Sequence, residues 1–124
     1  MKTWLVIAAL NGALAVALGA FAAHGLSGKI STDALGWFET GARYHMYHAL
    51  ALGLSALAMH GEAVRAARWS AWAFLAGIVL FSGSLYLLAL TGQHALVFIT
   101  PLGGAAFLVG WIMLAIAASR IKTA

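Results

Sequence analysis

Histidine has the broadest chemistry near neutral pH of any residue in this sequence, and the spacing of its copies is informative. The chain contains five histidines, of which His45 and His48 are three residues apart. A pair with this spacing shares one face of a helix and can chelate a divalent ion or hold a protonatable hydrogen-bond network. Four of the five are expected near one end of the predicted helices, where they form a candidate site for a metal, haem or small ligand: His24, His45, His48 and His94.

A second set of polar residues lies within long apolar stretches and consists of Asn11, Ser82, Ser84, Tyr86 and Thr100. Polar groups in hydrocarbon usually face the interior of a helix bundle and hydrogen-bond across helices, for about 0.6 kcal/mol each on average. Hydrogen bonding between helices is therefore the first interpretation of this set. The alternative is that these side chains line a cavity for a small molecule or lipid.

The sequence offers little else that could perform catalysis. It has no cysteine, which excludes disulfides, thiolate catalysis and thiolate metal ligands. No Ser/His/Asp set, paired intramembrane carboxylate or phosphate-binding glycine loop is evident, so an enzyme is the less favoured class and no cofactor is predicted. Three interpretations of the histidines stay open: interfacial side chains that bond backbone or headgroups, a metal or haem site, and a proton-relay or ligand-binding site.

The elements that carry these residues are predicted to be membrane-spanning helices. Apolar residues make up 64% of the 124 residues and charged residues 8%, against about 45–50% and about 25% in soluble domains. The charged residues leave four charge-free stretches, and crossing about 30 Å of hydrocarbon takes about 20 residues. The sequence therefore predicts one all-α domain, an integral membrane four-helix bundle, with spans at about 4–23, 44–61, 69–91 and 95–119.

The segment between the first two spans is expected to contain a short interfacial helix in the first outer loop. Ser31 or Thr32 can cap this helix, and Asp33 in its first turn is favoured by the helix dipole. Trp37 and Phe38 would hold it at the level of the lipid headgroups. The same segment could also continue into the second span without a break.

Small residues are expected at the helix contacts, because glycine lets two backbones approach closely in lipid. The glycines assigned to this role are Gly12, Gly19, Gly83, Gly103 and Gly104, with Gly77 and Gly110 as further members. Pro101 lacks a backbone donor, which predicts a kink near Thr100. These features favour a structural or accessory bundle that associates with itself or packs in a larger membrane complex.

Charge placement predicts the orientation, because Lys and Arg concentrate on the cytoplasmic side of membrane proteins. With four spans, one face carries Lys2, Arg65, Arg68, Arg120 and Lys122. The opposite face carries only Lys29 and Arg43 as basic residues. Both termini are therefore expected in the cytoplasm. The net charge of +4 is accounted for by residues beside anionic headgroups, so the expected partner is the lipid bilayer and not a nucleic acid.

The N-terminal apolar run also has features of a signal peptide. Met1-Lys2 precedes it, and Ala20-Phe21-Ala22 at its end resembles a cleavage site. The run is longer than the usual apolar region of about 7–15 residues, and Asn11 and Gly12 interrupt it as in a packed helix. We therefore expect the segment to be retained as the first span.

Four segments resemble the DUF423 family in order and spacing. They are residues 19–26 (GAFAAHGL), 42–52 (ARYHMYHALAL), 80–86 (LFSGSLY) and 99–104 (ITPLGG). The family consists of small bacterial inner-membrane proteins of unknown function, with a eukaryotic relative among the transmembrane proteins numbered 256. The resemblance implies a four-helix protein of the bacterial inner (cytoplasmic) membrane. It implies no activity and no catalytic residues.

Overall fold

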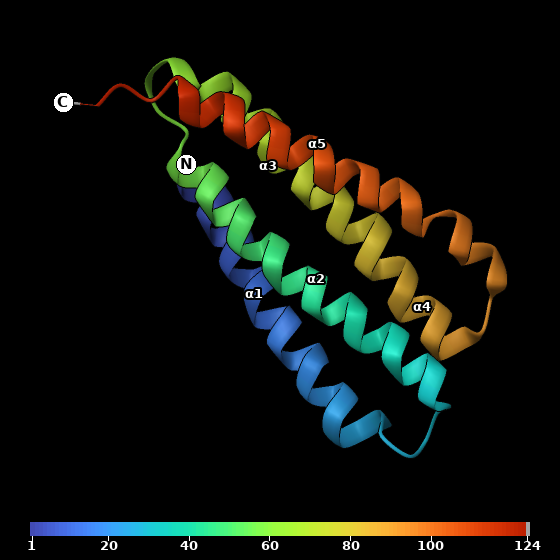
Figure 1. The fold of residues 1–124 in the computed structure, drawn as a ribbon. Coiled ribbons are helices and arrows are strands. Elements are labelled where there is room, and N and C mark those ends of the chain that lie inside the picture. Colours follow the sequence, from blue (N-terminus) through green and yellow to red (C-terminus); the bar gives the residue numbers. More distant parts are fainter. Residues whose placement is uncertain (124) are drawn as a thin grey trace.

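The computed structural model describes residues 1–123, and among these it contains helices and turns but no strand. The α-helices are α1 (Lys2–Phe21), α2 (Thr32–Leu57), α3 (Val64–Gly77), α4 (Gly83–Thr91) and α5 (Thr100–Ser119). π-helical turns at Ala22–Leu26 and Ile78–Ser82, and 3-10 turns at Gly61–Ala63 and His94–Phe98, extend or join them. The chain is therefore four long helical rods packed side by side, with α3 and α4 forming one rod (Figure 1). This confirms the predicted all-α class.

The two ends of the bundle differ in what they carry. One end, called the terminal end below, holds both chain termini and the turn between α2 and α3 (Figure 1). The other end, called the loop end, holds the turn between α1 and α2 and the turn between α4 and α5. Consecutive rods therefore run in opposite directions, as short connections require.

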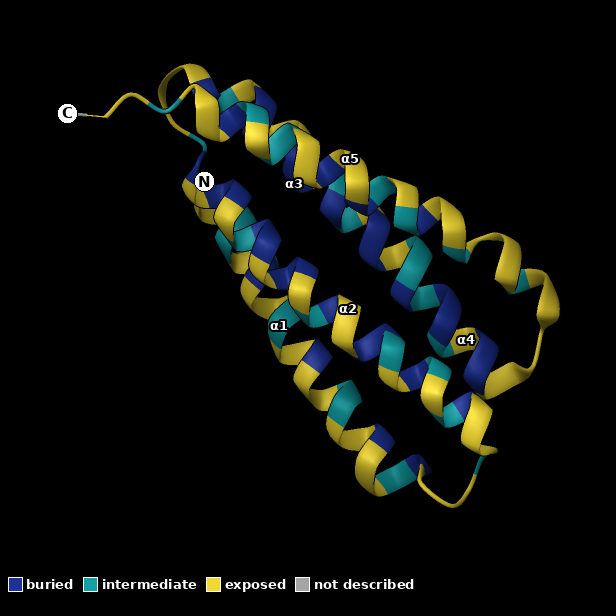
Figure 2. Ribbon diagram, in the orientation of Figure 1, coloured by how far each residue is buried: buried dark blue, intermediate teal, exposed yellow. Residues whose placement is uncertain are grey.

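Three of the four rods are long and apolar enough to cross a membrane: Lys2–Leu26, Gly61–Thr91 and His94–Ser119. The rod α2 is not in this group, because its middle carries Arg43, His45 and His48. It packs against α1, α3 and α4, and both of its histidines are buried. The most polar of the four rods therefore contacts most of the other rods. By contrast, α1 and α5 have exposed residues along much of their length (Figure 2).

The segment predicted as a separate interfacial helix is the first part of α2, without a break. The Ser31 hydroxyl caps this helix by accepting the Ala34 N–H at 3.1 Å. Phe38 is only 1% exposed and its ring lies 4.7 Å from the ring of Tyr86 on α4. Because these turns pack against the other rods, the structure shows one continuous helix and no separate interfacial one.

Pro101 lies in the first turn of α5, where the missing backbone donor has no helical partner to lose. A 3-10 turn at His94–Phe98 precedes it. The kink expected near Thr100 is therefore wrong. The proline marks the start of the α-helix instead.

The predicted packing glycines fall into two groups. A Cβ on Gly103 would overlap the backbone nitrogen of Phe81, so α5 and the π-turn at Ile78–Ser82 touch there through backbone. The nearest atoms to a Cβ on Gly83 and on Gly104 would lie at 4.0 Å, an ordinary contact. A Cβ on Gly12 or Gly19 would meet no described atom within 4 Å. Within one copy of the chain, only Gly103 among these five lies at a contact that excludes a side chain.

Candidate functional site

One polar cluster joins three helices through the buried side chain of His45. The Nδ1 atom of His45 lies 2.9 Å from the hydroxyl of Tyr86 on α4, and its Nε2 atom lies 3.0 Å from the amide oxygen of Asn11 on α1. Asn11 in turn donates its amide nitrogen to the carbonyl of Ile7 at 2.9 Å. His45 is 2% exposed, so this chain of hydrogen bonds crosses the bundle interior.

The direction of each bond in this cluster follows from the chemistry of its ends. The Ile7 carbonyl can only accept, which places the Asn11 amide nitrogen there and turns its oxygen toward His45. The Asn11 oxygen also only accepts, so His45 carries its hydrogen on Nε2. The remaining Nδ1 of a neutral His45 accepts the Tyr86 hydroxyl. The donors therefore run in one direction, from Tyr86 through His45 and Asn11 to the backbone of α1.

His48 has a separate set of partners on α2 and α5. Its Nδ1 donates to the Tyr44 carbonyl at 2.7 Å, and its Nε2 accepts the Trp111 indole N–H at 3.1 Å. Its ring stacks on Phe107 with centroids 3.5 Å apart. Because the carbonyl only accepts and the indole only donates, a single neutral tautomer fits both. Both ring nitrogens are therefore occupied within the chain.

Hydroxyl groups make the other polar contacts between rods. Ser55 on α2 lies 2.8 Å from Ser70 on α3, which donates to the Gly110 carbonyl of α5 at 2.9 Å. Ser84 lies 2.6 Å from Thr100, which connects α4 to α5. The Ser82 hydroxyl is buried in the π-turn and has no hydrogen-bond partner among the described residues.

The structure does not bring the four candidate histidines together. His24 and His94 are exposed at the loop end, whereas His45 and His48 are buried. Three residues of helix turn a side chain by about 300°, so His45 and His48 lie about 60° apart around α2. That angle directs His45 to α1 and α4, and His48 to α5. Across residues 1–123, no group of three or more His, Cys, Asp or Glu side chains is placed to hold a metal ion.

Sequence reasoning missed several members of these networks. Ser55, Ser70 and Trp111 were not assigned to a site, yet each bonds a residue at least 15 positions away. The only available signal was that Ser55 and Ser70 are hydroxyls inside or beside an apolar span. Trp111 lies 63 positions from His48, and no local pattern could pair them.

These networks connect neighbouring rods by hydrogen bonds. The His45 chain runs from the Tyr86 hydroxyl to the Asn11 amide and the Ile7 carbonyl. Buried hydrogen bonds of this kind hold neighbouring helices in register.

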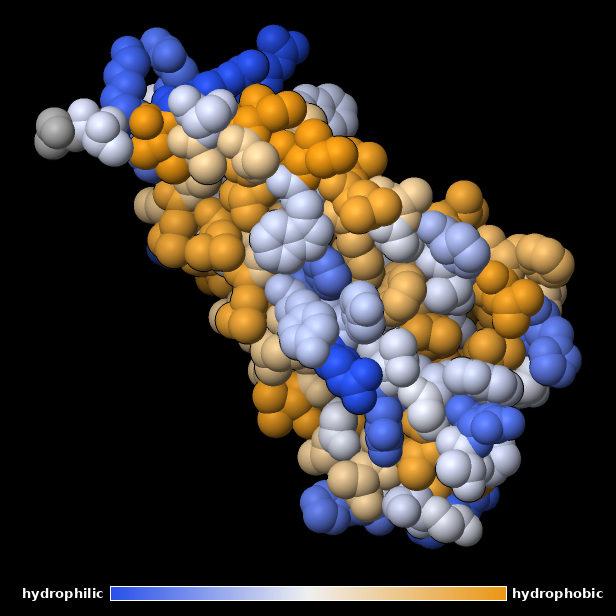
Figure 3. All heavy atoms as spheres, in the orientation of Figure 1, coloured by the Kyte–Doolittle hydropathy of each residue, from blue (hydrophilic) through white to orange (hydrophobic). Residues whose placement is uncertain are grey.

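Figure 3 shows hydrophilic residues at both ends and apolar residues over much of the surface between them, with a hydrophilic band across the middle of this face. A small helical protein with three helices long and apolar enough to cross a membrane belongs to the class of multi-pass membrane proteins. The chain is a member of the family described as "Protein of unknown function (DUF423)", whose model matches residues 18–104. The resemblance seen in the sequence is thereby confirmed.

Relatives of similar length extend this assignment over nearly the whole chain. The UPF0382 membrane protein YwdK of Bacillus subtilis is 50% identical over 121 residues, which cover 97% of this chain and 98% of that protein. A UPF0382 membrane protein of Haemophilus influenzae is 48% identical, covering 97% and 96%. The UPF0382 inner membrane protein YgdD of Escherichia coli K12 is 46% identical, covering 95% and 90%. No solved structure matches the chain.

Proposed function

We propose that this protein is a structural or accessory helix bundle of the inner membrane that associates with a second copy of itself. The observation that supports this most strongly is an open groove along α1 and α2, of about 360 Å³. It is lined by Leu5, Ala8, Ala9, Gly12, Ala49, Leu50, Gly53, Leu54 and Leu57.

The groove has the composition that favours helix association in lipid. Gly12 and Gly53 have no side chain that would keep another helix away. The space beside Gly12 is open, because a Cβ there would meet no described atom within 4 Å. Leu50 and Leu54 are 64% and 52% exposed and offer ridges to a partner. In a twofold dimer the same surface serves both copies, so the leucines of one copy can fill the groove of the other.

Filling the groove is expected to weaken self-association. In a Gly12→Leu variant the added side chain projects into open space, so the monomer folds as before while the partner helix is held away. Overpacking of this kind costs about 1–3 kcal/mol, and we expect the dimer dissociation constant to rise about tenfold or more. Sedimentation equilibrium in a neutral detergent measures it.

The matched control is Ala105→Leu, which adds a similar volume to an exposed position on α5. This variant should dimerise like the wild type. A wild type that stays monomeric at every concentration, or equal effects of the two substitutions, would contradict the dimer.

We further propose that the four rods are four spans with both termini in the cytoplasm. Three lie at about 4–23, 69–91 and 95–119, and the second covers more of α2 than the predicted 44–61, because His45 bonds Asn11 in the middle of α1 and Phe38 packs on Phe21. The positive-inside rule supports this orientation, since the terminal end carries five basic residues and one acidic residue: Lys2, Arg65, Arg68, Arg120, Lys122 and Glu62. The loop end carries the basic residue Lys29 with the acidic residue Asp33, and Glu39 and Arg43 lie farther along α2 toward its middle.

Cysteine labelling tests this orientation cleanly, because the chain has no cysteine of its own. In intact cells, an impermeant maleimide is expected to label Lys29→Cys from outside. Arg65→Cys should react only after the membrane is opened. The reverse pattern would place both termini outside.

A ligand at His24, His45, His48 and His94 stays a prediction, as does a cavity lined by Asn11, Ser82, Ser84, Tyr86 and Thr100. Elemental and optical analysis of the purified protein, beside a variant with His45→Ala and His48→Ala, tests the first. The proposed bundle requires neither.

A further inference from the structure

A stripe along α3 changes from basic to aromatic to small within two turns. Arg65, Arg68, Trp69, Trp72 and Ala73 follow the i, i+3, i+4, i+7, i+8 spacing of one helix face. The two arginines and the two tryptophans are exposed, with Trp69 at 61% and Trp72 at 55%. This face therefore presents charge at the terminal end and apolar surface toward the middle of the bundle.

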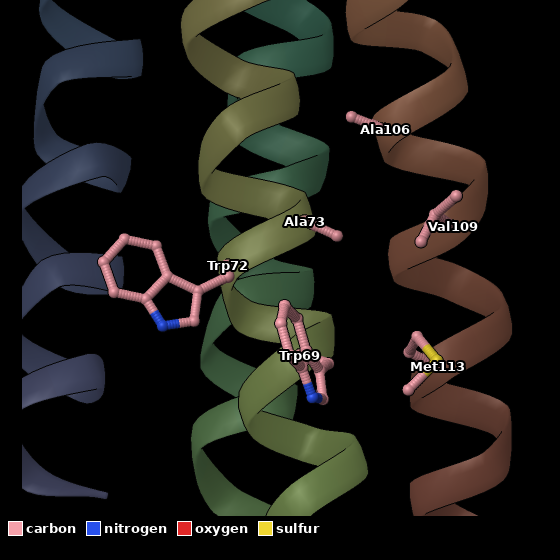
Figure 4. Close-up of a pocket in the computed structure, with 6 residues that line it drawn as sticks. All are labelled: Trp69, Trp72, Ala73, Ala106, Val109 and Met113. Atoms are coloured by element: carbon pink, nitrogen blue, oxygen red, sulfur yellow. The ribbon is translucent and has the colours of Figure 1, made fainter.

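The apolar part of the stripe lies beside a groove shared with α5. The groove has a volume of about 530 Å³ and is lined by Trp69, Trp72, Ala73, Ala106, Val109 and Met113. Figure 4 shows the Trp69 indole in front of α3, whereas the Trp72 indole points away from α5, toward α1. Trp72 packs there on Trp4 of α1, with ring centroids 5.0 Å apart. The small side chains of Ala73 and Ala106 leave the space into which a hydrocarbon chain would fit.

A second hollow joins this groove at the terminal end. Its lining is Arg65, Arg68, Trp69 and Trp72, so the two hollows share both tryptophans. Glu62 is the acidic residue of this end, and its carboxylate pairs with Lys122 at 3.1 Å. In the described part of the chain, neither Arg65 nor Arg68 forms an ion pair. The hollow therefore carries positive charge that no carboxylate among residues 1–123 pairs with.

We propose that this face of α3 and α5 binds an anionic glycerophospholipid. The guanidinium groups of Arg65 and Arg68 bind the phosphate, because guanidinium matches phosphate in geometry and charge. One acyl chain lies in the apolar groove beside Ala73 and Ala106. Tryptophan is enriched at the membrane–water interface, where its ring contacts acyl chains and its indole N–H contacts polar headgroups. Zwitterionic lipids fit less well, since their own cation would face the two arginines.

The site is independent of the proposed dimer and of the proposed orientation. The dimer surface lies on α1 and α2, and the lipid groove lies between α3 and α5. Either leaflet would place Arg65 and Arg68 among headgroups and the groove among acyl chains. An experiment that supports or rejects the lipid site therefore leaves the proposed dimer untested.

Native mass spectrometry of the detergent-purified protein, titrated with phosphatidylglycerol or phosphatidylcholine of equal chain length, tests the proposal. The wild type is expected to bind its first phosphatidylglycerol at least about fivefold more tightly than phosphatidylcholine. Each arginine should contribute about fivefold, so the variant carrying Arg65→Gln and Arg68→Gln should lose the preference. Both arginines are exposed, and circular dichroism should show unchanged helix content.

Two further variants separate a site from general surface charge. Lys2→Gln with Arg120→Gln removes the same charge from the same end without disturbing the Glu62–Lys122 pair, and should leave the preference intact. Ala73→Leu with Ala106→Leu fills the groove and should weaken binding of both lipids about tenfold. A wild type without preference, an equal loss in the Lys2/Arg120 variant, or full binding with the groove filled would each overturn the proposal.

Discussion

Replacing Gly103 with alanine is expected to destabilise the bundle by about 1–3 kcal/mol, the usual cost of overpacking a tight contact. A Cβ at this position would overlap the backbone nitrogen of Phe81 and lie 2.6 Å from its Cβ. Backbone cannot move aside as a flexible side chain can, so α5 would have to shift away from the rod formed by α3 and α4. That shift would also loosen the hydroxyl contact of Ser84 with Thr100.

The neighbouring glycine supplies the control. The nearest atom to a Cβ on Gly104 would be Cδ2 of Phe81 at 4.0 Å, an ordinary contact. Gly104→Ala should therefore be neutral or stabilising by up to about 1 kcal/mol, because alanine favours the helix over glycine. The free energy of unfolding in mixed micelles, followed by circular dichroism, measures both variants. Similar values for the two would show that α5 does not approach Phe81 this closely.

Replacing His45 with phenylalanine is expected to cost about 2–4 kcal/mol, although the ring is retained. The substitution leaves the Tyr86 hydroxyl without its acceptor and the Asn11 oxygen without its donor. Each buried polar group left unsatisfied costs about 1–3 kcal/mol. His60→Phe is the control, because His60 is exposed and surface changes usually stay within about 0.5 kcal/mol.

A double-mutant cycle shows whether the cost comes from the hydrogen bond. Tyr86→Phe alone should cost about 1 kcal/mol, because only one lone pair of His45 loses its partner. The variant with both His45→Phe and Tyr86→Phe has no Tyr86 hydroxyl left without a partner. Its loss of unfolding free energy should therefore be about 1 kcal/mol smaller than the sum of the two single losses. Strict additivity would mean that His45 and Tyr86 do not interact.

The helical class and the number of rods could be predicted from the sequence because the physics is local. A charge-free stretch of about 20 residues has to satisfy its backbone internally in lipid, and a helix does so without any partner. The helix boundaries were harder to predict, because they depend on contacts between rods. Residues 32–43 are polar enough to end a span, yet they continue α2 because Phe38 is buried against Phe21 and Tyr86.

The candidate site could be predicted in part. Asn11 and Tyr86 were singled out because a polar group inside an apolar stretch needs a partner, and His45 because of its spacing to His48. Their pairing could not be predicted, since the contacts join positions 34 and 41 residues apart. The two histidines, grouped by spacing, have different partners because about 60° of helix rotation separates them.

The sequence alone therefore determined that the protein lies in a membrane, that it is helical, and which residues need polar partners. These follow from composition and from distances along one helix. The tertiary structure alone decided which partners they find, that Gly103 excludes a side chain while Gly104 does not, and that the hollow lined by Arg65 and Arg68 shares Trp69 and Trp72 with an apolar groove. Those properties depend on how the rods are rotated against one another, and no pattern within a single rod records that rotation.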